Sequence, residues 1–225
     1  MALAAEPTTK GAGLEIMPGV ELWPGYFDRT EQALLVGYIF SRSVDAPFYR
    51  PRMPRTGKPF SVEETNFGSL GWVSDESGYR YEKTHPLARR RWPAMPPILE
   101  RTWFTLTRCS AGPECCLVNL YRGSARMGLH QDRDEAELRA PVLSVSLGDD
   151  AIFRIGGSTR RAPSRSFTLK SGDVLVFGGP ARLAFHGIDR VLEQSSRLVP
   201  GGGRLNLTLR RVAPFPQQKD ARPGG

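Results

Sequence analysis

Hydrophobic spacing divides the chain into a helical first half and a strand-rich second half. A hydroxyl side chain at Thr30 and a proline pair at residues 96–97 are helix-start signals, and apolar residues at helical spacing follow each of them. We therefore expect one helix to begin near Thr30 and a second helix to begin near Pro96.

From residue 115 onward the apolar period changes to two, and Gly, Pro, Asp and Ser separate most of the apolar runs. The predicted strands are Cys115–Tyr121, Val142–Leu147, Ala151–Ile155, Ser166–Leu169, Asp173–Phe177, Ala181–Phe185 and Arg204–Val212. Many short strands in about 100 residues are typical of a β-sandwich or jelly roll. The fold class is thus mainly β with flanking helices (α+β), and the preceding helices are expected to cover one sheet.

The last predicted strand alternates without a break between polar and leucine side chains. An ordinary strand with one face in water gives the same alternation. Two guanidiniums that flank an amide and a hydroxyl would, however, also fit a small dicarboxylate, because arginine binds carboxylates with two parallel hydrogen bonds. The polar face carries Arg204, Asn206, Thr208 and Arg210, and Asn119 with Tyr121 on another strand face could add neutral hydrogen bonds.

The composition favours a protein of the cytoplasm with an acidic partner. There are 31 basic and 23 acidic residues, a net charge of +8, which suits nucleic acid or an anionic membrane surface, although arginine-rich genome composition gives the same surplus. No apolar run is long enough to span a membrane, and Glu6 interrupts the apolar N-terminus where a signal peptide would continue. The three cysteines form no Cys-x-x-Cys pair, which argues against a disulfide framework or a zinc site.

Three residues form a candidate metal site. His130 and Asp132 are two positions apart, so in an extended backbone their side chains point the same way, and His186 follows another predicted strand. Two imidazoles and one carboxylate are the ligand set of non-haem Fe(II) oxygenases, which leave other coordination positions open. A His-x-Asp tripeptide alone is also explained by a structural hydrogen bond.

Five ordered blocks of sequence resemble the AlkB family, and in particular its bacterial members. The resemblance covers roughly residues 15 to 212, and it extends upstream through Leu70-Gly-Trp72, Gly78-Tyr79-Arg-Tyr81 and Trp92-Pro-Ala-Met-Pro96. The five blocks are Asn119-Leu-Tyr121, His130-Gln-Asp132-Arg-Asp134-Glu135, Val142-Leu-Ser-Val-Ser-Leu-Gly148, His186-Gly-Ile188 and Arg204-Leu-Asn206-Leu-Thr208-Leu-Arg210.

The resemblance implies a double-stranded β-helix (jelly roll) that uses Fe(II), 2-oxoglutarate and O₂. It implies metal ligation, and hence the catalytic role, for His130, Asp132 and His186. It implies 2-oxoglutarate binding by Asn119, Tyr121, Arg204, Asn206 and Arg210, and substrate contacts by Trp72, Tyr79, Tyr81, Asp134 and Arg160. Among the latter, Trp72 would stack on a flipped base opposite His130, and Asp134 would face its exocyclic amine.

The implied organisation is one compact unit with two flexible ends. Residues 1–13 and 213–225 are expected to be flexible, residues 14–113 to hold the helices and a nucleotide-recognition lid, and residues 114–212 to form the catalytic jelly roll. We expect a monomer. Within the lid, the segment Arg50–Thr65 resembles the family least, since it carries Phe60, Glu63 and Glu64 near positions that are more apolar in its bacterial members. Its basic, proline-broken part, Arg50–Lys58, is expected to be a loop, either a cationic lid or a solvated connection.

The implied activity is oxidative removal of N-alkyl groups from bases such as 1-methyladenine and 3-methylcytosine, with release of formaldehyde, succinate and CO₂. The expected partner is single- or double-stranded DNA with alkylated bases, with preference for single strands, and RNA is a further candidate. Two alternatives remain open from the residues: an oxygenase of the same fold that acts on RNA, lipid or protein, and a basic β-domain that binds nucleic acid without catalysis.

Overall fold

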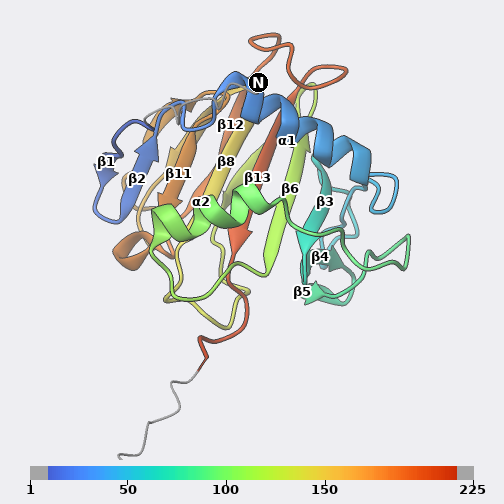
Figure 1. Cartoon of the computed structure of the whole chain (residues 1–225). Helices are drawn as coiled ribbons and strands as arrows, with labels where there is room; N and C mark the ends of the chain where they lie inside the picture. Colours follow the sequence, from blue (N-terminus) through green and yellow to red (C-terminus); the bar gives the residue numbers. More distant parts are fainter. Residues whose placement is uncertain (1–9, 217–225) are drawn as a thin grey trace, which may run out of the picture.

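The computed structural model describes residues 10–216, in which two helices pack on a large β-sheet (Figure 1). The flexible ends predicted at 1–13 and 213–225 therefore lie mostly outside the described residues. In chain order the elements are β1 (Leu14–Met17), β2 (Val20–Trp23), α1 (Arg29–Arg42), β3 (Glu63–Gly68), β4 (Gly71–Asp75), β5 (Gly78–Glu82), α2 (Pro97–Thr107), β6 (Cys115–Tyr121), β7 (Met127–His130), β8 (Val142–Gly148), β9 (Asp150–Ile155), β10 (Arg165–Leu169), β11 (Val174–Phe177), the 3₁₀ turn η1 (Gly179–Ala181), β12 (His186–Leu192) and β13 (Arg204–Arg210).

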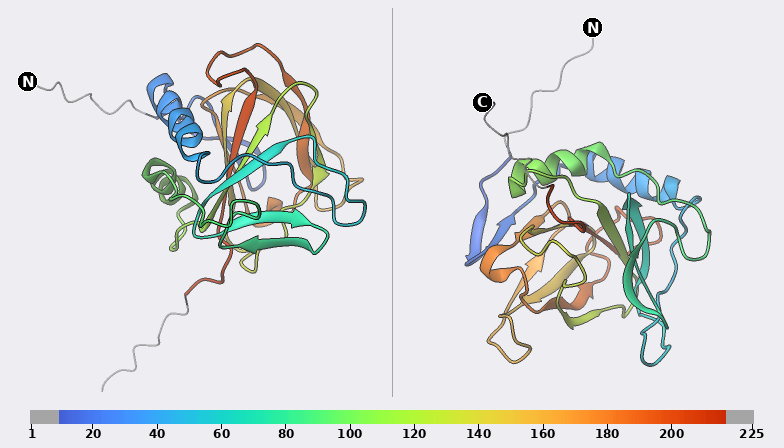
Figure 2. Two further views of the ribbon diagram at one scale, coloured as in Figure 1. Left: turned by 90° about the vertical axis from the view of Figure 1, so that its right-hand side faces the viewer. Right: turned by 90° about the horizontal axis from the view of Figure 1, so that it is seen from below.

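The strands form a jelly roll of two antiparallel sheets. The larger sheet has the order β1-β2-β11-β8-β13-β6-β3, the smaller sheet has the order β10-β9-β12-β7, and β4 and β5 form a separate hairpin. Viewed from below, the helices lie on one side of the larger sheet and the smaller sheet lies on the other (Figure 2). The predicted mainly-β fold with helices covering one sheet is confirmed.

The alternation of leucine and polar side chains along β13 gives the strand one face in the core and one face toward the smaller sheet. Leu205, Leu207 and Leu209 are fully buried in the core that the larger sheet shares with α1 and α2. The side chains between them face the smaller sheet because successive strand residues point to opposite faces. A sequence that fills one face with leucine therefore presents its arginines and its amide to the space between the sheets.

The two helices begin close to the predicted positions, but α1 uses a different cap. The carboxylate of Asp28 accepts a hydrogen bond from the backbone N–H of Glu31, whose own carboxylate accepts one from the N–H of Asp28. This reciprocal pair is a capping box, so the predicted cap at Thr30 is wrong by two residues. Pro97 occupies the first turn of α2, as expected from its fixed φ and missing N–H.

The strand predicted at Ala181–Phe185 is wrong. Residues Gly179–Ala181 form a 3₁₀ turn, and the backbone N–H of Ala184 donates to Ala181 O, which closes a further turn. Gly179 has a φ of 50° and Pro180 has no N–H, so neither residue fits a β-ladder. The turn that they begin continues into the predicted strand. The strand begins instead at His186, and this shift puts His186 at the start of β12.

The segment that resembles the family least, Arg50–Thr65, is mostly loop and ends in β3, the strand at one edge of the larger sheet. The predicted loop Arg50–Lys58 has no regular element, and isolated bridges join Tyr49 to Glu64 and Arg52 to Pro59 before β3 pairs with β6. Sequence periodicity missed β3 because four consecutive polar residues, 63–66, show no alternation. Among residues 10–216, no helix is both long enough and apolar enough to span a membrane.

His85 is a structural residue of the loop that follows β5. It is fully buried, its Nδ1 accepts hydrogen bonds from the backbone N–H groups of Leu87 and Ala88 (3.0 Å each), and its Nε2 donates to Pro47 O (2.8 Å). Burial lowers the pKa of His85 below its ordinary value of 6.5, partly offset by the bond to Pro47. Protonation of Nδ1 would remove the acceptor for two backbone donors.

We predict that His85 makes the protein less stable in acid. Because its folded pKa lies below the unfolded value, its contribution is present above about pH 6.5 and is lost as the pH falls below that value. His85→Asn keeps an acceptor near Nδ1 but does not titrate, so its free energy of unfolding should fall less between roughly pH 7 and pH 5. Denaturant unfolding across this range measures the slopes, and equal slopes in both proteins would contradict the prediction.

Candidate active site

A cavity of about 470 Å³ lies between the two sheets. The larger sheet lines it with β3, β6, β8 and β13, the smaller sheet with β7, β9 and β12, and Trp72 and Tyr79 of the β4–β5 hairpin also line it. The residues that line it include eleven of the predicted site residues: Trp72, Tyr79, Asn119, Tyr121, His130, Asp132, Asp134, Arg160, His186, Asn206 and Arg210.

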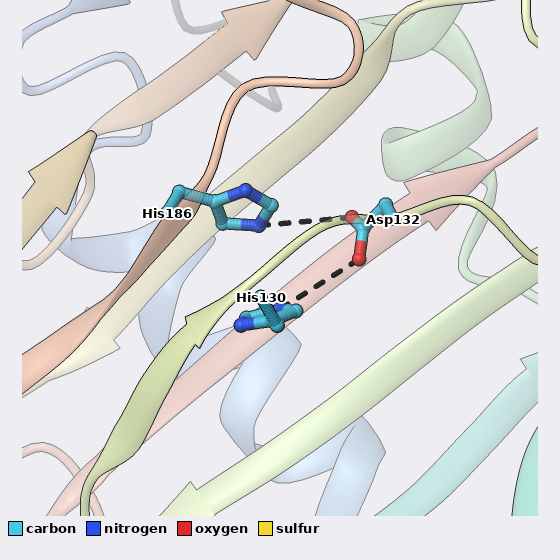
Figure 3. A group of neighbouring side chains, drawn as sticks. All are labelled: His130, Asp132 and His186. Carbon is cyan, nitrogen blue, oxygen red and sulfur yellow. Dashed lines mark ion pairs between the residues drawn. The ribbon is translucent and has the colours of Figure 1, made fainter. Parts of the chain in front are cut away.

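The predicted metal-binding residues come together on the side of the smaller sheet (Figure 3). His130 ends β7 and is the register partner of His186 at the start of β12, so the two imidazoles lie with ring centroids 4.4 Å apart. Asp132 lies 3.7 Å from His130 Nε2 and 3.9 Å from His186 Nε2, through one carboxylate oxygen each. One ligand atom from each of the three residues lies within 4.8 Å of the others, which suits a single ion.

Backbone carbonyls orient both imidazoles for metal binding. His130 Nδ1 is 3.0 Å from Gly128 O, and His186 Nδ1 is 3.0 Å from Ala184 O. When Nδ1 donates its proton to a carbonyl, Nε2 is left as the unprotonated nitrogen, and in both residues Nε2 faces Asp132. The pair of neutral imidazoles and one carboxylate is a donor set that fits Fe(II).

Buried arginines keep Asp132 ionised. Burial alone would raise its pKa, but Arg210, the two histidines and Arg182 together hold the pKa of Asp132 well below its usual range. Arg210 donates to both carboxylate oxygens, at 2.7 and 3.2 Å. Burial, followed by repulsion from His130, lowers the pKa of His186 to about 4, so this imidazole is neutral at physiological pH.

Arg204 is a buried cation that lacks an anionic partner in the described part of the chain. It is fully buried, and it donates to Ser146 Oγ at 2.7 Å and to Asn206 Oδ1 at 3.3 Å, but its Nε has no hydrogen-bond partner among the described residues. No carboxylate among residues 10–216 forms an ion pair with it, and burial lowers the pKa of Arg204 to about 10. Asn119, the register partner of Asn206, also has a buried oxygen, Oδ1, that lacks a donor among residues 10–216. A small dicarboxylate would fit Arg204, because a carboxylate satisfies a buried guanidinium.

Aromatic side chains form another wall of the cavity. Trp72 stacks on Tyr79 with ring centroids 5.4 Å apart and an interplanar angle of 19°, and Phe60 lies 6.3 Å from Trp72. The indole N–H of Trp72 donates to Asp134 Oδ2 at 2.9 Å. This bond fixes the ring relative to the segment after β7, which carries both Asp132 and Asp134. We call Phe60, Trp72 and Tyr79 the aromatic wall.

Two predicted site residues lie behind the cavity wall. Arg204 donates a hydrogen bond to Asn206, which itself lines the cavity. The hydroxyl of Tyr81 is hydrogen-bonded to Glu135 and lies 3.4 Å from Arg210 Nη1. Arg160 lines the cavity at its exposed rim, with its guanidinium 5.1 Å from the centroid of the Phe185 ring.

Sequence reasoning gave no role in the site to two charged residues, Arg182 and Glu64. Arg182 is buried, bonds to the backbone oxygen of Asp132 and forms an ion pair of 2.9 Å with Glu135. Glu64 lines the cavity with a buried, unpartnered oxygen. Arg182 lies in the turn that was predicted to be a strand. Neither Arg182 nor Glu64 belongs to an alternating pattern of polar and apolar residues, so the sequence did not indicate that either side chain points toward the site.

Comparisons with known proteins agree with this geometry. Residues 19–210 match the 2OG-Fe(II) oxygenase superfamily. The chain is 57% identical over 199 residues to an alpha-ketoglutarate-dependent dioxygenase AlkB homolog of Caulobacter vibrioides, covering 88% of this chain and 90% of the relative. It is 39% identical over 190 residues to alpha-ketoglutarate-dependent dioxygenase AlkB of Escherichia coli, covering 83% and 86%. The solved structure of OsALKBH1 superposes with a TM-score of 0.77 at 28% identity, covering 89% of this chain and 100% of that one.

We predict that Asp132→Asn weakens metal binding at least about tenfold, because it removes the anionic ligand while keeping the side-chain shape. Titration with Mn(II), followed by calorimetry, measures the affinity. Asp134→Asn is the matched control, since Asp134 contacts Trp72 and is outside the ligand group. Equal affinities in wild type and Asp132→Asn would contradict the assignment of the metal site.

We also predict that Arg204→Met weakens binding of 2-oxoglutarate to the Mn(II)-loaded protein at least about tenfold, since a charge-assisted hydrogen bond is lost. The thermal midpoint should not fall, because the variant removes a buried charge without a counter-ion. Arg154→Met serves as the control, because Arg154 lies in β9 and pairs with Asp189 at 2.7 Å. Unchanged binding of 2-oxoglutarate in Arg204→Met would show that the anion binds elsewhere.

Proposed function

The chain belongs to the 2OG-Fe(II) oxygenase superfamily and, within it, to the AlkB family, and on this basis we propose that it demethylates alkylated nucleic-acid bases. It is a dioxygenase that takes Fe(II) as its metal and 2-oxoglutarate and O₂ as co-substrates. The proposed substrates are single-stranded DNA, and also RNA, with bases such as 1-methyladenine and 3-methylcytosine.

The observation that carries this proposal is that one cavity holds both a metal-binding triad and an aromatic wall. His130 belongs to the triad, and Trp72 belongs to the aromatic wall, and both line the same space. An oxidised alkyl group must lie beside the metal while its base needs a surface on which to stack. The cavity supplies both requirements within about 470 Å³.

The chain's own residues have separable roles in the proposed reaction. His130, Asp132 and His186 hold the iron, and Arg204 holds the distal carboxylate of 2-oxoglutarate. When bound, Fe(II) with 2-oxoglutarate and O₂ supplies the oxidation that hydroxylates the N-alkyl carbon, with formaldehyde, succinate and CO₂ as products. Asn119, Tyr121, Asn206 and Arg210 complete the proposed co-substrate site.

The base is proposed to leave the helix stack and enter between Trp72 and His130. Stacking on an aromatic side chain compensates for the stacking that is lost, by about 1–3 kcal/mol per base. Asp134 is proposed to accept from the exocyclic amine of the base and to attract a cationic lesion, and Tyr79 and Tyr81 to contact the nucleotide. A single strand favours this entry because no base pair has to be broken.

Exposed arginine side chains line the cavity at its rim. Arg126, Arg133 and Arg160 line it and are exposed, and the whole chain carries a net charge of +8. Contacts between arginine and phosphate hold a strand without reading its sequence, as repair of scattered lesions requires. More distant relatives support a nucleic-acid substrate, since they are named DNA N(6)-methyladenine demethylase ALKBH1C of Arabidopsis thaliana and tRNA demethylase abh1 of Schizosaccharomyces pombe.

The two alternatives stand differently. A basic domain without catalysis is set aside, because the chain belongs to a family of dioxygenases and carries the metal-binding group. An oxygenase of the same fold acting on lipid or protein has no specific observation in its favour, whereas the aromatic wall and the arginine rim favour a base attached to a phosphate backbone.

We predict that the protein removes the methyl group from a single-stranded oligonucleotide carrying one 1-methyladenine, in the presence of Fe(II), 2-oxoglutarate and ascorbate. Mass spectrometry of the oligonucleotide detects the loss, and Asp132→Ala should show none. Trp72→Ala should convert 2-oxoglutarate to succinate in the absence of DNA as wild type does, but lose demethylation at least about tenfold through its stacking contribution. An unchanged oligonucleotide, with succinate still formed, would overturn the substrate assignment.

A further inference from the structure

Glu64 is a buried carboxyl group that the reaction described above does not use. It lies in β3, where it pairs in register with Asn119 of β6, and both side chains line the cavity. It is 1% exposed, and its Oε2 has no hydrogen-bond partner among residues 10–216. A buried carboxyl oxygen without a donor is costly, so its position in a cavity wall suggests that a donor arrives with a ligand.

The co-substrate cannot be that donor. Two atoms of this part of the wall, Asn119 Oδ1 and (when the carboxyl is ionised) Glu64 Oε2, are acceptors without a donor among residues 10–216. 2-Oxoglutarate at neutral pH carries two carboxylates and one keto group, all of which only accept hydrogen bonds. Placing it beside Glu64 would give neither unpartnered oxygen a donor, and it would bring two anionic groups together whenever Glu64 is ionised.

The amino group of an alkylated base has the opposite character. 3-Methylcytosine carries an exocyclic amino group and, when protonated, a positive charge, whereas 3-methyluracil has the same ring and methyl group but presents a carbonyl oxygen at that position. Only the former supplies N–H donors to a carboxyl oxygen.

The charge of Glu64 agrees with a cationic ligand. Burial, partly offset by Arg210, raises the pKa of Glu64 to about 8, so in the absence of a ligand its carboxyl is largely protonated at neutral pH. A positive charge in the cavity favours the ionised form, which would then accept a charge-assisted hydrogen bond from the amino group and offset the positive charge of the base. A neutral base presenting a carbonyl gains neither effect.

We propose that Glu64 is a specificity-determining residue, which selects cationic, amino-bearing alkylated bases over neutral ones that present a carbonyl in the same position. The inference rests on the proposed demethylase function and deepens it. Glu64 accepts from the amino group of the base deep in the cavity, from the side of the larger sheet, while Asp134 lies beside the aromatic wall.

The neighbouring residue Glu63 provides a matched control. It is in the same strand, but its register partner is Leu120, which packs in the core beneath the helices, so Glu63 points to the opposite face. It lies 3.6 Å from Arg50 and does not line the cavity. Glu63→Gln removes the same charge from β3 without changing the wall.

The test compares kcat/KM for two single-stranded oligonucleotides that differ only in carrying 3-methylcytosine or 3-methyluracil. Wild type should prefer 3-methylcytosine, and Glu64→Met should reduce the ratio at least about tenfold, since it removes a charge-assisted hydrogen bond. Glu64→Gln, which keeps an acceptor but cannot ionise, should fall between them, and Glu63→Gln should keep the wild-type ratio.

Folding and co-substrate binding are followed separately, by thermal melting and by calorimetric titration of 2-oxoglutarate into the Mn(II)-loaded variants. Glu64→Met should melt no lower than wild type, because it removes an unpartnered buried carboxyl. An unchanged ratio in both Glu64 variants would overturn the inference and show that Glu64 is satisfied by water or is merely structural. If the wild-type protein removes the methyl group from neither oligonucleotide but still forms succinate, the proposed function is overturned instead.

Discussion

The ion pair between Asp132 and Arg210 is the interaction on which the site depends. Arg210 ends the last strand of the larger sheet, and Asp132 follows β7 of the smaller sheet, so this buried contact of 2.7 Å joins the two sheets beside the metal ligands. Breaking such a pair from one side leaves a buried charge and costs about 3–5 kcal/mol. Arg182 and Glu135 form a second buried pair behind it, so the carboxylate that faces the histidines is held in place before any metal binds.

The two arginines of β13 lie in different electrostatic surroundings, so one strand can bind two different anions. They are six residues apart on the same face of the strand, and both are buried, but among residues 10–216 only Arg210 has a carboxylate partner. Arg204 keeps an unpartnered Nε beside Ser146 and Asn206. Because an isolated buried cation is unfavourable, a fold that keeps one is poised to gain free energy from an incoming carboxylate.

The sequence alone predicted those strands and side-chain groupings that depend on strict alternation or on a complete motif. The polar face of β13, strand β6 and the grouping of His130, Asp132 and His186 were all predicted and are found in the structure. Positions set by irregular backbone were not: the 3₁₀ turn at Gly179–Ala181 moved the strand start to His186. Glu64 was noted only as unusual, because four polar residues in a row give no indication of which side chain enters a cavity. Long-range packing, rather than local propensity, decides such positions.

The central claim is that metal, co-substrate and alkylated base occupy one cavity between the sheets. Its most direct test is an oxygen-free crystal structure of the protein with Mn(II), 2-oxoglutarate and a short single strand containing one 1-methyladenine. We expect the metal on the triad, a carboxylate at Arg204 and the base stacked on Trp72 with its methyl group facing the metal. A base bound outside the cavity, or a co-substrate that leaves Arg204 without an anion, would contradict it.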